Sequence, residues 1–266
     1  MQLLLARGAP VSLRDNKGAS PLHYAAALHK GEELVRQLVD GGAKLDDVDK
    51  KGRTAVHWAA GAGRTRTVQL LLKRQPGLGL LKDKDGLTAL HCSAARGQTQ
   101  SLCSLLFVLP HLAKERDKGG ATGLMYAAKE GHREVVSALL RHGEAVDTRD
   151  MAGQTALHWA LLGGHTRTAS LLKENGADLW QRTTTKDSLL HSAVKAKSTE
   201  AIGWVIRSFS SNFALIVYEM HTFEPLQSQT SPRERDLGEL QQPNRPPPRF
   251  PGWSPPCSPT PSRCRR

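Results

Sequence analysis

Eleven histidines and four cysteines are the residues of this 266-residue chain that could bind a metal or transfer protons. Histidine titrates near neutral pH, and histidine and cysteine are the usual zinc ligands. The cysteines form no CxxC pair, however, and no HExxH motif is present. The chain also lacks a GxSxG elbow, a Walker loop, a GxGxxG turn and the HRD and DFG motifs of kinases. We therefore expect no catalytic residues, no cofactor and no bound metal.

Five of the histidines close a tetrad that recurs along the chain. The tetrads are SPLH at 20–23, TAVH at 54–57, TALH at 88–91, TGLM at 122–125, TALH at 155–158 and SLLH at 188–191. Their spacing is 34 residues three times and then 33 residues twice. The five histidines are His23, His57, His91, His158 and His191. The ligands of one metal converge on a point, whereas residues with this period lie along the axis of a stack, so we expect these histidines to be structural.

A period of about 33 residues with a T-x-L-H tetrad resembles the ankyrin repeat, and the resemblance covers roughly residues 1–209. It implies an all-α solenoid, in which each unit has two short antiparallel helices and a projecting β-turn finger. We assign residues 1–13 to a partial repeat. The full repeats are expected at about 14–47, 48–81, 82–115, 116–148, 149–181 and 182–209. In the family, the tetrad histidine hydrogen-bonds to the tetrad threonine and to backbone groups.

The local residue pattern supports the same units. Each tetrad begins with Ser or Thr, which are good helix N-caps, and small residues such as Ala59 and Ala60 follow. Two helices cannot bury their apolar faces alone, so neighbouring units must stack. In the second and third units, Pro76 and Pro110 are predicted to end the second helix early.

Five units carry an Asp and a Gly at fixed places before the tetrad, which resemble the finger of the family. The aspartates are Asp15, Asp49, Asp83, Asp117 and Asp150, and the glycines are Gly18, Gly52, Gly86, Gly120 and Gly153. The sixth unit has Thr183 and Lys186 at these places, so it departs from the finger pattern, as a capping repeat would.

Cys92 directly follows His91, an order that could indicate a thiol–imidazole pair. The residues at the equivalent place in the other units are Tyr24, Trp58, Tyr126, Trp159 and Ser192. Most of these are large packing residues, so we interpret Cys92 as a buried structural cysteine. We likewise predict that Trp58 and Trp159 belong to the core.

In the family, partners are held by the finger tips and by the exposed side of the first helix. The matching positions here are Asn16, Lys17, Lys50, Lys51, Arg53, Lys84, Asp85, Arg96, Lys118, Lys129, Glu130, Met151 and Gln154. Through the fourth unit, six charged tip residues are basic and one is acidic. We predict a basic concave strip that attracts an acidic segment of a partner protein. The alternative stays open that these are ordinary solvated residues, because the whole chain has a net charge of +12.

The pattern fails after residue 209. Residues 210–224 hold an apolar run and are left as an uncertain end segment, and residues 225–266 are predicted to be a disordered Pro-rich tail. Within the tail, Arg245, Pro248 and Pro251 fit an R-x-x-P-x-x-P pattern that resembles one class of SH3 ligand. Four residues that precede proline are candidate phosphorylation sites: Ser231, Ser254, Ser258 and Thr260.

The sequence therefore predicts a non-catalytic protein-interaction module that acts as an adaptor or scaffold through its concave finger and inner-helix surface. Two alternatives stay open: the recognition portion or truncated isoform of a larger signalling or ubiquitin-ligase protein, and a weak binder of anionic polymers. No run of 18 apolar residues is present, which argues against a membrane span, and no signal peptide is evident. We expect a monomer in the cytoplasm or nucleus, with protein partners and no specific nucleic acid.

Overall fold

The structure is a computed structural model that describes residues 10–209 of the chain. Within this range the helices come in pairs, and no strand is present. The first helices are α2 (Pro21–Ala27), α4 (Ala55–Gly61), α6 (Ala89–Ala95), α8 (Gly123–Lys129), α10 (Ala156–Leu162) and α12 (Leu189–Lys195). The second helices are α3 (Glu32–Asp40), α5 (Thr65–Arg74), α7 (Thr99–Val108), α9 (Arg133–Arg141), α11 (Thr166–Glu174) and α13 (Thr199–Phe209).

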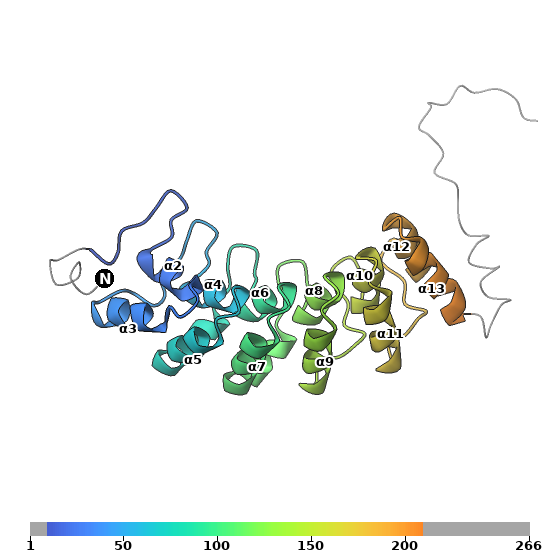
Figure 1. Cartoon of the computed structure of the whole chain (residues 1–266). Coiled ribbons are helices and arrows are strands. Elements are labelled where there is room, and N and C mark those ends of the chain that lie inside the picture. Colours follow the sequence, from blue (N-terminus) through green and yellow to red (C-terminus); the bar gives the residue numbers. More distant parts are fainter. Residues whose placement is uncertain (1–9, 210–266) are drawn as a thin grey trace, which may run out of the picture. The chain divides into compact units, whose positions relative to one another are not determined.

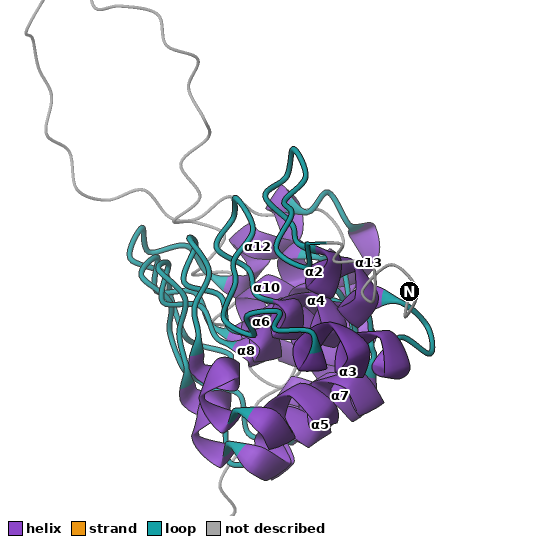
Figure 2. Cartoon of the chain, turned by 90° about the vertical axis from the view of Figure 1, so that its left-hand side faces the viewer, coloured by secondary structure: helices purple, strands orange, loops and turns teal. Residues whose placement is uncertain are grey.

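The pairs stack side by side in chain order, so that the described residues form a solenoid (Figure 1). Each first helix packs against the first helices of the neighbouring pairs and against the second helix of its own pair. The long loops between pairs project to one side of the helices, as the view from the α2 end shows (Figure 2). The predicted all-α solenoid with fingers is therefore confirmed for this range.

The first helices begin at the tetrads because a side chain at each tetrad satisfies backbone groups that the helix leaves unpaired. In α4, the Thr54 side chain accepts a hydrogen bond from the backbone of His57, and the His57 side chain accepts one from the backbone of Thr54. The same capping box starts α2, α6, α10 and α12. It is missing from α8, where Met125 stands in place of the histidine.

The core lies between the two rows of helices and runs through the whole stack. Alanines on the first helices, such as Ala59 and Ala60, have no solvent exposure and let neighbouring pairs approach closely. Leucines from the second helices, such as Leu71 and Leu105, fill the remaining space and are also fully buried. Burying one such leucine contributes about 1.5–3 kcal/mol, so most of the stability comes from packing between units.

Two features of individual units differ from what the sequence pattern predicts. Helices α5 and α7 do not end early: each has 10 residues, against nine in α3, α9 and α11. Pro76 and Pro110 instead open short 3₁₀ helices, η1 (Pro76–Leu80) and η2 (Pro110–Lys114), just after those helices. A proline at the first helical position removes only an N–H that has no helical partner.

The second difference concerns the sixth unit, which forms a finger although its residues depart from the finger pattern. Lys186 adopts a left-handed backbone with φ 62° at the place of the usual glycine. The Thr183 hydroxyl accepts the backbone N–H of Asp187 at 3.0 Å, as the aspartate carboxylates do in the other fingers.

Several predictions concern residues outside the described range. They are the beginning of the partial first repeat, the apolar end segment at 210–224, and the Pro-rich tail at 225–266 with its SH3-like motif and phosphorylation candidates.

Candidate protein-interaction surface

Each finger is held in shape by the carboxylate of its own aspartate. In the second finger, Oδ1 of Asp49 accepts the backbone N–H groups of Lys51 and Arg53, both at 2.9 Å. The other four aspartates accept the N–H four residues later in the same way. Gly52 completes the turn with φ 79°, and a Cβ there would lie 3.0 Å from the backbone nitrogen of Lys84 in the next finger. Asp and Gly therefore build the first five fingers, and Thr183 and Lys186 take their places in the sixth.

One backbone hydrogen bond joins each finger to the finger before it. The donor N–H and acceptor carbonyl pairs are Lys50 to Lys17 (2.9 Å), Lys84 to Lys51 (2.9 Å), Lys118 to Asp85 (3.1 Å), Met151 to Gly119 (2.9 Å) and Thr184 to Ala152 (2.9 Å). We call these linked fingers the finger row. The row fixes the position of each tip relative to its neighbours, so side chains from separate repeats form one surface.

The tetrad histidines tie the finger row to the first helices. Nδ1 of His57 accepts the backbone N–H of Thr54 at 3.2 Å, so the ring proton lies on Nε2, which donates to the carbonyl of Leu87 at 3.0 Å. His23 makes the equivalent bond to Arg53 at 2.9 Å. Burial lowers the pKa of His57 and His91, and lowers that of His158 to about 4. These imidazoles are therefore neutral at physiological pH. His23 and His57 link a finger to a helix, whereas Nε2 of His91 and of His158 is buried without a hydrogen-bond partner among residues 10–209.

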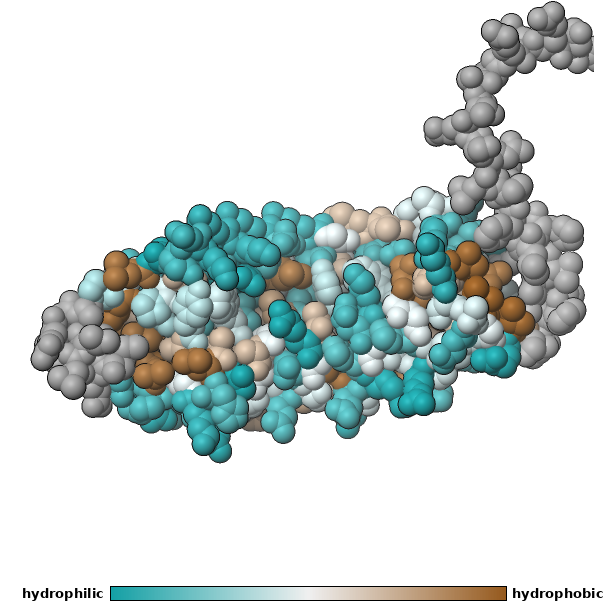
Figure 3. Space-filling view, turned by 45° about the horizontal axis from the view of Figure 1, so that its top comes forward, coloured by the Kyte–Doolittle hydropathy of each residue, from teal (hydrophilic) through white to brown (hydrophobic). Residues whose placement is uncertain are grey.

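Five of the six predicted basic residues of the fingers are exposed. Lys17, Lys50, Lys51, Lys84 and Lys118 lie along the finger row, and none of the five makes an ion pair with a residue in the range 10–209. We call them the lysine strip. Figure 3 shows hydrophilic side chains gathered along this edge towards the N-terminal end of the array. The strip therefore leaves its charge available to a partner.

Arg53 differs from the other basic tips, because it is already bound. Its guanidinium lies 2.8 Å from the Asp49 carboxylate and 5.2 Å from the centre of the Trp58 ring. Only a third of its side chain is exposed (33%). It therefore supports the second finger as much as it offers charge.

The remaining predicted partner-binding residues lie around this surface. Asn16, Asp85 and Met151 are exposed on the fingers, with Met151 reaching 75% exposure, and Gln154 is half-buried. Arg96, Lys129 and Glu130 are exposed at the ends of α6 and α8. The structure therefore brings the predicted residues to the fingers and the first-helix ends.

A row of aromatic side chains, which the sequence interpretation missed, lies behind the fingers. Each ring donates to Oδ2 of the aspartate nine residues earlier. The pairs are Tyr24 Oη with Asp15 (2.5 Å), Trp58 Nε1 with Asp49 (3.1 Å), Tyr126 Oη with Asp117 (2.7 Å) and Trp159 Nε1 with Asp150 (3.0 Å). Trp58 and Trp159 are partly exposed, and only Trp159 packs against the core, so their assignment to the core holds only in part. The constant spacing of nine residues was the signal that could have revealed this row.

Neighbouring rings in this aromatic row touch edge to face. The ring centres of Tyr24 and Trp58 are 5.4 Å apart with planes at 70°, and those of Tyr126 and Trp159 are also 5.4 Å apart, with planes at 66°. This arrangement is favourable because the positive edge of one ring meets the negative face of the next. Between Trp58 and Tyr126 the row is interrupted at Cys92.

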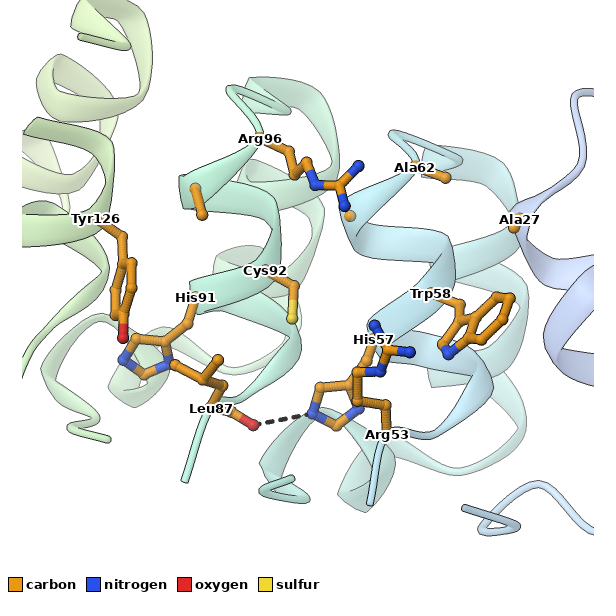
Figure 4. A pocket seen from close by; sticks show the side chains of 12 residues that line it. Ala27, Arg53, His57, Trp58, Ala62, Leu87, His91, Cys92, Arg96 and Tyr126 are labelled. Carbon is orange, nitrogen blue, oxygen red and sulfur yellow. Dashed lines mark hydrogen bonds between the residues drawn. The ribbon is translucent and has the colours of Figure 1, made fainter. Parts of the chain in front are cut away.

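A pocket of about 370 Å³ lies at this interruption. Trp58 and Tyr126 stand on either side of it, and Cys92, Arg53 and Arg96 contribute to its wall (Figure 4). Cys92 is partly exposed there, so the prediction of a buried cysteine holds only in part. Desolvation by burial, with the nearby charge of Asp83, raises the pKa of its thiol to about 11, and the thiol is therefore protonated at neutral pH and a poor nucleophile.

Among residues 10–209, no cluster of histidine, cysteine and acidic side chains is arranged to hold a metal ion. In the same range, no helix is long and apolar enough to cross a membrane.

Known proteins share these features. The family model described as ankyrin repeats (3 copies) matches residues 1–78, 26–114, 77–150 and 101–183. Because the matches cover well over half of the sequence, the chain belongs to the ankyrin-repeat family, and it carries a protein-interaction module.

A solved structure supports the same conclusion. The chain is similar to the crystal structure of the ankyrin repeat domain of Bcl-3, described as a unique member of the IkappaB protein family. The TM-score is 0.61 and the sequence identity is 28%, over 77% of this chain and 89% of that chain. No curated protein sequence gives a significant match. The predicted family and fold are thus confirmed.

Proposed function

We propose that this chain is a non-catalytic adaptor or scaffold whose finger row and first-helix ends bind an acidic segment of a partner protein. The observation that supports this most is the lysine strip, five exposed lysines without ion pairs on fingers that are hydrogen-bonded to one another. Like charges held side by side create a positive potential that raises the association rate of an acidic partner.

A single exposed ion pair contributes at most about 1 kcal/mol, so several lysines have to act together. The rigid row permits this, because its backbone bonds hold the charges without further ordering of loops when a partner binds. Binding through exposed charges also weakens as salt rises, since the Debye length falls to about 8 Å at physiological ionic strength.

The test is affinity capture from cell lysate at physiological salt, with the full chain as bait. The strip variant carries Lys50→Glu, Lys51→Glu and Lys84→Glu. The control carries Lys73→Glu, Arg141→Glu and Lys173→Glu, which change the net charge equally but lie on the second helices. We expect proteins that both the wild type and the control recover to be lost from the strip variant. Equal recovery by all three baits contradicts the proposal.

A second candidate follows from the same lysines, which would also attract an anionic polymer. Its signature is binding to single-stranded DNA that falls steeply between low and physiological salt without sequence preference. Binding to DNA that persists at physiological salt, together with no recovered protein, favours this candidate over the adaptor.

We place this activity inside the cell, in the cytoplasm or the nucleus, because Cys92 and Cys103 are free thiols, as in a reducing compartment. The proposal has four further parts. They are the monomeric state, the repeat boundaries, an SH3-type partner for residues 245–251, and membership of a larger signalling or ubiquitin-ligase protein. Size-exclusion chromatography with light scattering tests the first of these directly.

A further inference from the structure

The interruption of the aromatic row leaves one aspartate without its usual partner. Oδ1 of Asp83 holds its finger as elsewhere, through the N–H groups of Asp85 (2.9 Å) and Leu87 (2.8 Å). Its Oδ2 accepts no hydrogen bond from any residue between 10 and 209. The cause is visible in the sequence, because the residue nine positions later is Cys92, whose side chain is too short to reach and is a weak donor.

The pocket at Cys92 therefore has the features of the site that a ring occupies elsewhere in the stack. It has an aromatic ring on each side, Trp58 and Tyr126. The Asp83 carboxylate is not part of its wall, but its charge acts on the Cys92 thiol, and in the neighbouring repeats the ring at this place reaches the equivalent aspartate. Its volume of about 370 Å³ lies within the range of pockets that bind small molecules and side chains.

We propose that this pocket receives one tyrosine or tryptophan side chain from the acidic segment of the partner protein. This inference rests on the proposed function, which supplies the acidic segment. The inserted ring contacts Trp58 and Tyr126 edge to face, as adjacent rings in the row do at 5.4 Å. Its hydroxyl or indole N–H donates to Asp83, the bond that the four other fingers make with their own ring. The partner thus completes the aromatic row.

The charges at the pocket require acidic residues beside the inserted ring. Arg96 is exposed at the end of α6, lines the pocket, and forms no ion pair with any residue of the described range. Lys84 projects from the adjoining finger and is also unpaired. A carboxylate of the partner on either side of the ring reaches Arg96 or Lys84. The ring itself has to supply a hydrogen-bond donor, because the carboxylate oxygen of Asp83 can only accept.

The probe is a short fluorescein-labelled peptide, Asp-Glu-Trp-Glu-Asp, with versions that carry Tyr, Phe or Ala at the centre. Fluorescence anisotropy at physiological salt measures its affinity for the full chain. We expect the Trp and Tyr peptides to bind at least about tenfold more tightly than the Ala peptide. The Phe peptide should be about fivefold weaker than the Tyr peptide, because it offers Asp83 no hydrogen bond.

Two substitutions at one position separate the pocket from the surrounding charge. Cys92→Tyr supplies the missing ring from the chain itself and is expected to weaken the Trp peptide at least about tenfold, while Cys92→Ala keeps the pocket and the affinity. Thermal unfolding shows whether Cys92→Tyr is folded. Arg96→Glu, on an exposed side chain, is a second variant whose folding is not at risk, and it should weaken the acidic peptides about tenfold.

Four results overturn the inference: no peptide binds the wild type, the Ala peptide binds as well as the Trp peptide, a folded Cys92→Tyr variant keeps full affinity, or Arg96→Glu leaves the affinity unchanged. The proposed function is tested separately by protein capture. If the lysine strip is needed for capture while Cys92→Tyr recovers the same proteins, the adaptor role stands and the aromatic pocket does not.

Discussion

A buried carboxyl group closes the fourth repeat, where two other repeats have an alanine. Glu144 follows Gly143, in the place that Ala43 and Ala177 take elsewhere, and only 5% of it is exposed. Its Oε1 accepts the N–H of Leu124 at 3.4 Å, and its carboxyl group lies against the Thr122 hydroxyl. Burial disfavours the charged form and raises the pKa of Glu144 from 4.5 to about 7.

The Glu144→Gln variant should be more stable than the wild type at pH 8, and this advantage should shrink at pH 5. The folded state holds the proton more tightly than the unfolded state, so the wild type loses stability as pH rises from about 4.5 to 7, by up to about 3 kcal/mol. Urea unfolding at both pH values measures the difference. Burial lowers the pKa of histidines such as His158, so these residues reduce the stability of the fold as the pH falls. Because the variant and the wild type share these histidines, comparing the two cancels their effect.

Glu134→Gln is the matched control, because Glu134 is exposed on α9. If Glu144→Gln and Glu134→Gln change the free energy of unfolding by the same amount at pH 5 and also at pH 8, the buried carboxyl group of Glu144 has no special effect.

At the scale of the elements, the start of α8 differs from the other first helices. Thr54 takes part in a capping box with His57, whereas the equivalent Thr122 hydroxyl has no histidine partner and lies against the Glu144 carboxyl group. We expect Thr54→Val to lower the free energy of unfolding by about 1–2 kcal/mol, because a cap is lost. Thr122→Val should lower it less, because no capping box is lost and only the contact with Glu144 changes. Chemical denaturation of both variants checks this; equal losses contradict it.

The sixth finger carries strain that a glycine would remove. Lys186 has φ 62°, a conformation that costs a residue with a side chain about 1 kcal/mol or more. Lys186→Gly should therefore raise the free energy of unfolding by about 0.5–1 kcal/mol, despite the greater freedom of glycine in the unfolded chain. Lys84→Gly, on a finger without this strain, should destabilise instead. Denaturation curves that rank the two variants in the opposite order contradict the explanation.

Helices, caps and five fingers could be predicted from the sequence, because each depends on residues close together in the chain. The sixth finger could not, because Thr183 and Lys186 replace the usual residues and only the hydrogen-bonding geometry shows that a hydroxyl can act as the carboxylate does. The 3₁₀ helices that follow α5 and α7 could not be predicted from the sequence either. Proline is compatible with either an early helix end or a following 3₁₀ turn, and packing decides between them.

At the scale of the whole array, each repeat contacts mainly its neighbours, so stability is distributed along the stack. Leu90 on α6 is fully buried between central repeats. We expect Leu90→Ala to lower stability by about 2–5 kcal/mol through the lost contacts and the cavity. Hydrogen exchange should show lost protection around α6 and its neighbours before α12. A uniform loss over residues 10–209 would instead show that the array unfolds as one unit.

The candidate site could be predicted only in part. The lysines of the strip follow from their place in the repeat, because finger tips are exposed whatever their neighbours are. The pocket at Cys92 depends on what surrounds one small residue in three successive repeats, namely the rings of Trp58 and Tyr126 and the oxygen left by Asp83. The sequence interpretation compared Cys92 with the rings at its place in other repeats but took those rings for core packing, so it predicted a buried cysteine instead of a pocket.

The single hydrogen bond between successive fingers also sets a spacing that a partner sequence has to match. Each finger advances with its helix pair, and packed helices lie about 8–10 Å apart. An extended chain advances about 3.3 Å per residue, so about three of its residues span one repeat. A partner that runs along the finger row therefore meets the lysine strip most often if its acidic residues recur at every third position.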